Sequence, residues 1–179
     1  MACAKDLGRA QHGQRLRRRL DHAVEPQKDA FAAAVVEILI VDLEHRLAIE
    51  PAALLWGPDL DVERLEELNA EARVAIEEED DDLFIAVNQA FHHVVLAAMG
   101  SKTLGDTMDQ LDAFLRLATL PILEREPAFN RRFIEVNEHI VELVQSGDRQ
   151  AASDYLQVQL MKQAEAIIEM IEKINNGAV

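Results

Sequence analysis

The chain has 179 residues, 49% of them hydrophobic, and its 18 Lys or Arg and 33 Asp or Glu give a formal net charge of −15. This length can bury one core of ordinary size, and the single cysteine, Cys3, excludes an internal disulfide framework. No apolar run approaches the roughly 18 to 20 residues that cross a membrane, and no apolar signal core opens the chain, so we expect a soluble, cytoplasmic protein.

The first thirty residues differ in charge from the rest. Residues 1–30 hold seven Lys or Arg and four Asp or Glu, which leaves 11 basic and 29 acidic residues, a net charge of −18, for 31–179. A body this acidic repels phosphate backbones and is a poor nucleic-acid surface. Only the basic segment RLRRRL (Arg15–Leu20) could contact nucleic acid, and the favoured interpretation of 1–30 is a solvated arm or remnant linker.

Helical patterns cover the remainder of the chain. Seven glycines, five prolines and the lack of alternating Val, Ile and Thr runs disfavour strands. Six main helices are predicted, over residues 31–55, 62–76, 83–99, 102–124, 128–145 and 149–174. Because short loops join long amphipathic helices, neighbouring helices are expected to be antiparallel, and 31–175 is expected to form one all-α bundle.

The predicted loops carry capping signals. An Asp in WGPDLD can cap the helix over 62–76, Ser101 follows the helix-terminating Gly100, and Asp148 follows Gly147. The acidic run Glu77–Asp82 is interpreted as a solvated turn.

Two polar residues in NQAFHHVVLAAMG share the apolar face of their predicted helix. Asn88 and His92 lie four residues apart, and the positions three and four residues away from them are mostly apolar. Both side chains are therefore expected to point inward. His93 falls on a less apolar face and is expected to be more exposed.

The later helices repeat this arrangement. Asn137 has apolar neighbours at helical spacing and is predicted to point inward. His139 is expected at the boundary between the buried and exposed faces, and Gln159 lies beside an apolar stripe of its helix. A buried amide or imidazole without a partner costs about 1–3 kcal/mol. The partners can be one another, water or a ligand, and mutual satisfaction within the core is the alternative to a binding site.

Enzyme signatures are scarce. The chain has no Gly-rich phosphate loop, no nucleophile elbow and no Glu-x-x-His pair of the di-iron bundles, and Cys3 is too near the N-terminus to serve as a nucleophile. We therefore expect a protein that is not an enzyme.

Three segments together resemble a known sensing domain. HRLAIEPAALL (His45–Leu55), NQAFHHVVLAAMGS (Asn88–Ser101) and HIVELVQSGDRQAASDYLQVQL (His139–Leu160) are similar to the FadR C-terminal domain (FCD), the ligand-sensing module of GntR-type bacterial transcription regulators. The resemblance covers about 33–173. Its anchors are Arg46, Glu50, Pro51, Phe91, His92, Gly147 and Asp148. It implies an antiparallel bundle of six to seven helices with a central cavity.

That family often holds a divalent metal through an Asp and a His four apart and two later His residues. At the matching positions this chain has Asn88, His92, Asn137 and Gln159. Neutral amides are poor ligands for such metals, so no metal cofactor is expected, and His92 is only a weak candidate ligand. His139 could replace Asn137 only through a two-residue register shift. Asn88 and His92 are interpreted as the remnant of a metal cradle that now bonds a ligand directly.

The resemblance also suggests Arg46 as a carboxylate-binding group, with a helical salt bridge to Glu50 as the alternative. Arg116 is a weaker second candidate. The predicted ligand-binding set is thus Arg46, Asn88, His92, Asn137 and Gln159, and the predicted ligand is a small, acidic metabolite.

The resemblance further implies a homodimer that contacts DNA only through a winged helix-turn-helix. Residues 1–30 show neither a wing nor a helix-turn-helix pattern, so this part of a GntR-type regulator is not expected within this sequence. The other interpretation of the whole chain is a structural or protein-interaction bundle with no ligand pocket.

Overall fold

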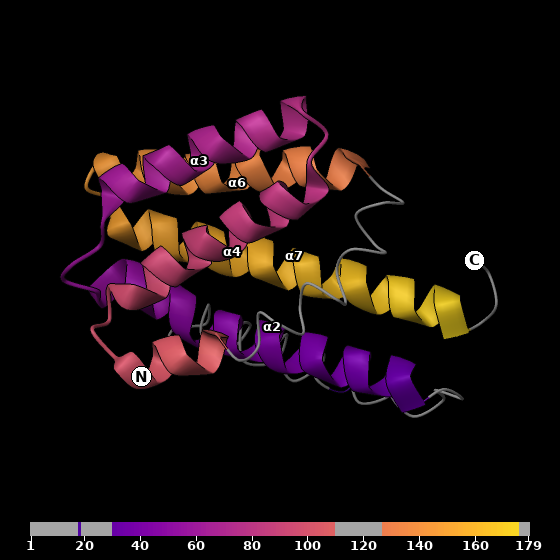
Figure 1. Ribbon diagram of the computed structural model, residues 1–179. Helices are drawn as coiled ribbons and strands as arrows, with labels where there is room; N and C mark the ends of the chain where they lie inside the picture. Colours follow the sequence, from indigo (N-terminus) through magenta and orange to yellow (C-terminus); the bar gives the residue numbers. More distant parts are fainter. Residues whose placement is uncertain (1–17, 19–29, 110–126, 176–179) are drawn as a thin grey trace.

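All regular secondary structure in the described part of the chain is helical. A computed structural model describes residues 18, 30–109 and 127–175. Its helices are α2 (Ala30–Trp56), α3 (Val62–Glu77), α4 (Asp81–Ala97), α6 (Pro127–Gln145) and α7 (Arg149–Asn175), and a further helical segment covers 102–109 (Figure 1). No strand occurs in these ranges, and the predicted all-α class is confirmed.

Helix boundaries follow the sequence pattern closely, with one exception. The helices α2, α3, α6 and α7 begin and end within one residue of their predicted limits. However, α4 begins at Asp81 because the Asp80 side chain caps it, accepting a 2.9 Å hydrogen bond from the Leu83 backbone N–H. The acidic run is therefore only partly a turn. Carboxylates in the first turn of α4 are favoured by the helix dipole, which the interpretation as a solvated turn overlooked.

The predicted caps are confirmed. The side chain of Asp61 accepts a 3.0 Å hydrogen bond from the Arg64 N–H at the start of α3, and Asp148 accepts one of 2.9 Å from Ala151 at the start of α7. Ser101 caps the segment 102–109 at 3.4 Å. Gly147 has φ of 83°, which turns the chain sharply between α6 and α7 and leaves these two helices antiparallel.

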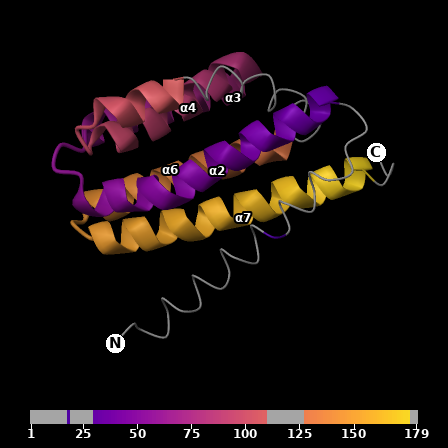
Figure 2. The same cartoon turned by 90° about the horizontal axis from the view of Figure 1, so that it is seen from below.

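The five labelled helices contact one another in a closed ring. Helix α2 packs against α7, α7 against α6, α6 against α3, α3 against α4, and α4 returns to α2. Figure 1 shows α3 beside α6, with α7 between that pair and α2, and Figure 2 shows α2 and α7 side by side from below. Each helix therefore turns one stripe of side chains toward a shared interior.

Apolar side chains from the whole ring fill this interior. Leu54, Leu65, Phe91, Ile140 and Leu156 come from five different helices and are each at most 2% exposed. The apolar area that they remove from water provides the main driving force for assembling the ring.

Some sequence predictions lie outside the described residues. These are residues 1–17 and 19–29 of the arm, the part of the fourth predicted helix beyond 109, and the candidate Arg116. Within the described ranges, no helix is both long and apolar enough to cross a membrane.

Gly57 stands where three helices meet. It follows the last residue of α2, its carbonyl accepts a 2.7 Å hydrogen bond from Arg149 of α7, and Ala98 at the end of α4 lies directly against it. A Cβ at this position would lie 2.5 Å from the Ala53 carbonyl oxygen and 2.7 Å from the Ala98 Cβ. Both neighbours are rigid, so only a residue without a side chain fits.

We predict that Gly57→Ala lowers the free energy of unfolding by about 1–3 kcal/mol, as expected for overpacking against backbone and a short side chain. Urea unfolding followed by circular dichroism measures the change. Gly105→Ala is the matched control, because a Cβ there meets nothing within 4 Å and replaces a glycine in a helical segment. Equal stability of the wild type and the Gly57 variant would contradict the close approach of α2 and α4.

Candidate functional site

A pocket lies between α6 and α7, with α4 contributing to its wall. It has a volume of about 50 Å³. Three of the five predicted binding residues line it, one from each helix: His92 of α4, Asn137 of α6 and Gln159 of α7. The remaining lining residues are Arg132, Phe133, Val136, Leu156, Leu160, Lys162, Gln163 and Ala166.

Helical spacing explains why these side chains meet. On α7 the lining positions Leu156, Gln159, Leu160 and Gln163 recur every three or four residues, which is one face of a helix. On this face apolar and amide side chains alternate. The pocket consequently has apolar walls with a few fixed hydrogen-bonding groups, as is common in small-molecule sites.

An amide pair joins α4 to α6 beside the pocket. The Asn137 Nδ2 donates a 3.1 Å hydrogen bond to the Asn88 Oδ1, and Asn137 is only 5% exposed. Asn88 is half-buried and is not among the residues that line the pocket. This bond uses one N–H of Asn137, so its carbonyl oxygen and second N–H retain the capacity to bond a ligand.

A buried carboxylate holds His92 from behind. Glu50 of α2 is fully buried, and its Oε2 lies 2.7 Å from the His92 Nδ1. Because an ionised carboxylate only accepts hydrogen bonds, Nδ1 is the donor, and a neutral imidazole then has its acceptor at Nε2. Glu50 therefore sets both the orientation and the tautomer of a ring that lines the pocket.

Arg46 stands on the other side of Glu50. Its Nε lies 3.8 Å from the Glu50 Oε1, an ion pair that is too long for a hydrogen bond, and Arg46 is 5% exposed. Arg46 does not line the pocket. The helical salt bridge that was the alternative interpretation of Arg46 is thus present, and the carboxylate-binding role stays a prediction.

The faces of α4 and α6 that the sequence predicted to be buried are the buried ones in the structure. His92 is 4% exposed and Asn137 is 5% exposed, whereas the His93 side chain is 28% exposed and lies 3.6 Å from Asp109. The His139 side chain is 46% exposed and packs edge-on against Tyr155, with ring centroids 4.6 Å apart. The two inward residues are therefore those that helical spacing selected.

Burial raises the pKa of the Tyr155 phenol, the nearby Glu135 carboxylate adds to the rise, and Arg132 opposes it. Tyr155 is therefore neutral near pH 7.

Sequence reasoning missed Glu50, Arg132, Lys162 and Gln163 as residues of this site. A signal existed for two of them. Glu50 was recognised as the possible partner of Arg46, and Gln163 lies one turn beyond Gln159 on the same helix face. Arg132 and Lys162 carried no such signal, since a charged residue near a helix face usually just reaches solvent.

The residues at this site do not fit the metal that resemblance to the sensing family implies. Asn88 and Asn137 are neutral amides bonded to each other, and one nitrogen of His92 is bonded to Glu50. In the described ranges, no group of three or more His, Cys, Asp or Glu side chains is placed to hold a metal ion. A donor set of amides with one imidazole lacks the charge and softness that zinc or nickel sites require.

Comparison with known families identifies the chain. The family model of the FCD domain matches residues 42–172, which include every residue of the pocket and the Arg46–Glu50–His92 cluster. The chain belongs to the FCD family. FCD domains are ligand-sensing domains of GntR-type regulators, so a regulatory, effector-binding role follows from membership. No curated protein and no solved structure matches this FCD chain.

We predict that Glu50→Gln lowers the free energy of unfolding by about 1.5–3 kcal/mol, because it removes the charge from a buried carboxylate that faces Arg46 and His92. Chemical denaturation measures it. Glu71→Gln, which removes an exposed carboxylate paired with Arg64, is the control and should leave the unfolding midpoint unchanged. If both variants unfold at the wild-type midpoint, the buried charge does not hold this FCD bundle together.

Proposed function

We propose that the chain is the effector-binding domain of a GntR/FadR-type transcription regulator and that its pocket binds a small organic acid directly, without a metal. The convergence of His92, Asn137 and Gln159 from three helices carries this proposal. Such a ligand would join α4, α6 and α7 through hydrogen bonds, and binding would favour one relative position of these helices.

The chain acts in this proposal as a cytoplasmic sensor rather than as an enzyme. DNA contact would come from a winged helix-turn-helix, because the net charge of −18 over 31–179 opposes phosphate binding by the bundle. Dimerisation is proposed from family membership, since regulators of this type read two-fold DNA sites.

The second candidate is a structural bundle whose polar core residues satisfy one another. The Asn88–Asn137 hydrogen bond favours it, because this pair needs no ligand to account for its burial. Gln159 and Gln163 favour the sensor, since both line the pocket and no hydrogen bond joins either to another residue of the described chain.

We predict that a screen of organic acids and sugar acids finds a ligand that raises the melting temperature, with or without EDTA and added divalent metals. A free ligand concentration of 100 times the dissociation constant stabilises the folded state by about 2.7 kcal/mol. Gln159→Leu should weaken that ligand about three- to tenfold by removing one hydrogen bond. Gln157→Leu is the matched control, because Gln157 is also half-buried on α7 but does not line the pocket. Stabilisation that requires an added metal, or that both variants lose equally, would contradict this site.

We predict that the protein is a homodimer, with a mass by light scattering of about twice the 20.1 kDa of one chain. A mass near 20.1 kDa at micromolar concentrations would rule out the dimer but would leave the ligand-binding proposal intact.

A further inference from the structure

The two charged side chains that line the pocket, among the described residues, are both basic. Among the residues that the structure describes, its lining includes Arg132 of α6 and Lys162 of α7 and no Asp or Glu. In a chain with 33 acidic and 18 basic residues, a pocket whose described charged lining is basic departs from the average composition. Such a rim attracts anions from solution and raises their local concentration.

Arg132 and Lys162 also differ from most other basic side chains of the bundle in their ion-pair partners. Within the described residues neither Arg132 nor Lys162 has a salt bridge or a hydrogen bond. Four other basic side chains of the bundle pair with carboxylates: Arg46 with Glu50, Arg64 with Glu67 and Glu71, Arg73 with Glu138 and Lys102 with Asp106. Arg149 donates to the Gly57 carbonyl. No partner within the described part of the chain occupies Arg132 or Lys162, so both can donate hydrogen bonds to a carboxylate.

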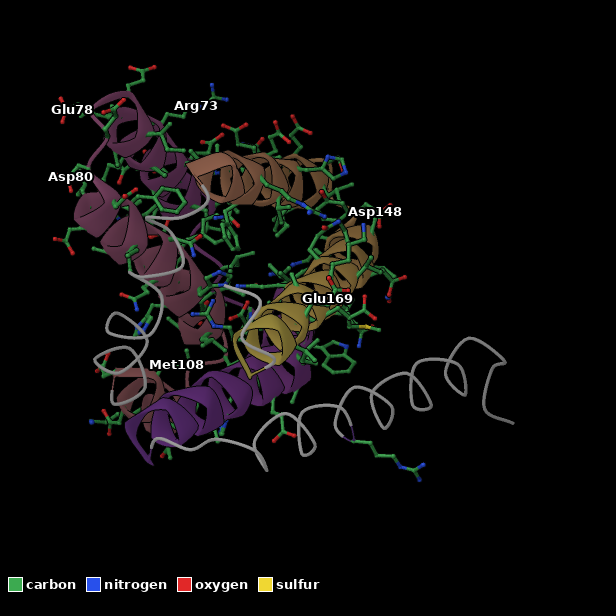
Figure 3. All side chains as sticks on the ribbon, turned by 90° about the vertical axis from the view of Figure 1, so that its right-hand side faces the viewer. Arg73, Glu78, Asp80, Met108, Asp148 and Glu169 are labelled. Carbon is green, nitrogen blue, oxygen red and sulfur yellow. The ribbon has the colours of Figure 1, made fainter. Side chains whose placement is uncertain are left out.

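Both cations lie on the same side of the pocket amides. Arg132 is five residues from Asn137 and Lys162 is three residues from Gln159, in each case away from the α6–α7 loop. At 1.5 Å per residue these separations are about 7.5 and 4.5 Å along the helix axes. Figure 3 views the bundle from this end, where α6 begins and α7 ends, with Arg73 and Glu169 labelled at its edge. The pocket therefore has a cationic mouth and a neutral, amide-lined inner end.

The inner end does not suit a second negative charge. Its polar groups are the amides of Asn137 and Gln159 and the imidazole of His92, behind which lies the carboxylate of Glu50 at 2.7 Å. An anionic group bound against His92 would approach Glu50, whereas a hydroxyl, carbonyl or amide would only exchange hydrogen bonds. The whole pocket has a volume of about 50 Å³, which limits its ligand to a small molecule.

We propose that Arg132 and Lys162 bind the carboxylate of the effector at the mouth of the pocket, while His92, Asn137 and Gln159 bind a neutral polar group at its other end. This inference rests on the proposed sensor function and specifies its ligand class. The class is a short carboxylate with a hydroxyl, keto or amide group about four carbons away, since such a molecule spans about 6 Å between its terminal oxygens. Arg46, which faces Glu50, takes no part in holding the acid.

The test uses the whole chain and three probes, namely 4-hydroxybutanoate, butanoate and 4-hydroxybutanamide, with affinities measured by calorimetry or ligand-observed NMR. Wild-type protein is expected to bind 4-hydroxybutanoate best, since each of the other probes lacks one of the two recognised groups. The double variant Arg132→Gln, Lys162→Gln should lose about tenfold in affinity for both acids and nothing for the amide. Added salt should weaken the acids in the wild type alone.

The double variant Arg64→Gln, Lys102→Gln is the control, because it removes the same two charges from exposed positions outside this pocket. Equal loss of acid binding in both double variants would indicate a general charge effect and would overturn the assignment. So would an amide that binds the wild type as well as the acid does. If the wild type binds neither acid, the ligand class is wrong, and the broader screen with Gln159→Leu decides separately whether the pocket is a sensor.

Discussion

Enclosing the carboxylate of Glu50 is the constraint around which the rest of this bundle is arranged. A fully buried carboxylate is very costly unless charged and hydrogen-bonding partners surround it. Arg46 supplies one partner from the same helix, and His92 supplies the other from α4. Because His92 is 42 residues away in sequence, this contact requires α2 and α4 to meet, and their meeting closes the ring of helices. The imidazole that lines the pocket is therefore fixed by the same interaction that completes the fold.

The pocket has amides at the positions where the resemblance implies metal ligands. Where the resemblance places a carboxylate and imidazoles, this chain places amides, and two of them, Asn88 and Asn137, bond each other across α4 and α6. Replacing charged ligands by neutral amides removes the electrostatic attraction for a dication and the repulsion among ligands that the dication would offset. What remains is a set of donors and acceptors that suit hydroxyl, carbonyl or amide groups.

Charge and burial differ between the two ends of the pocket. The net negative charge of the chain disfavours contact between the bundle and phosphate backbones. Among the described residues, Arg132 and Lys162 have no carboxylate partner and face the pocket. In the pocket lining, His92 and Asn137 are buried, whereas Arg132 and Lys162 are exposed to solvent. Carboxylate binding at a solvated rim avoids the full desolvation cost that an ion pair in the core would carry.

The sequence by itself determined most helix limits, the caps and the inward direction of His92 and Asn137, but not the burial of Asn69 and Gln89. These features depend on contacts within a few residues, so period and capping signals predict them, as the limits of α3 and the exposure of His92 against His93 illustrate. The early start of α4 escaped prediction because its acidic first turn resembles a solvated loop. Only the tertiary structure decided that Glu50 holds His92, that Asn88 bonds Asn137, and that Arg132 and Lys162 border the same pocket. These residues lie on separate helices, and the packing of apolar stripes around the ring, which no local pattern encodes, sets the distances between them.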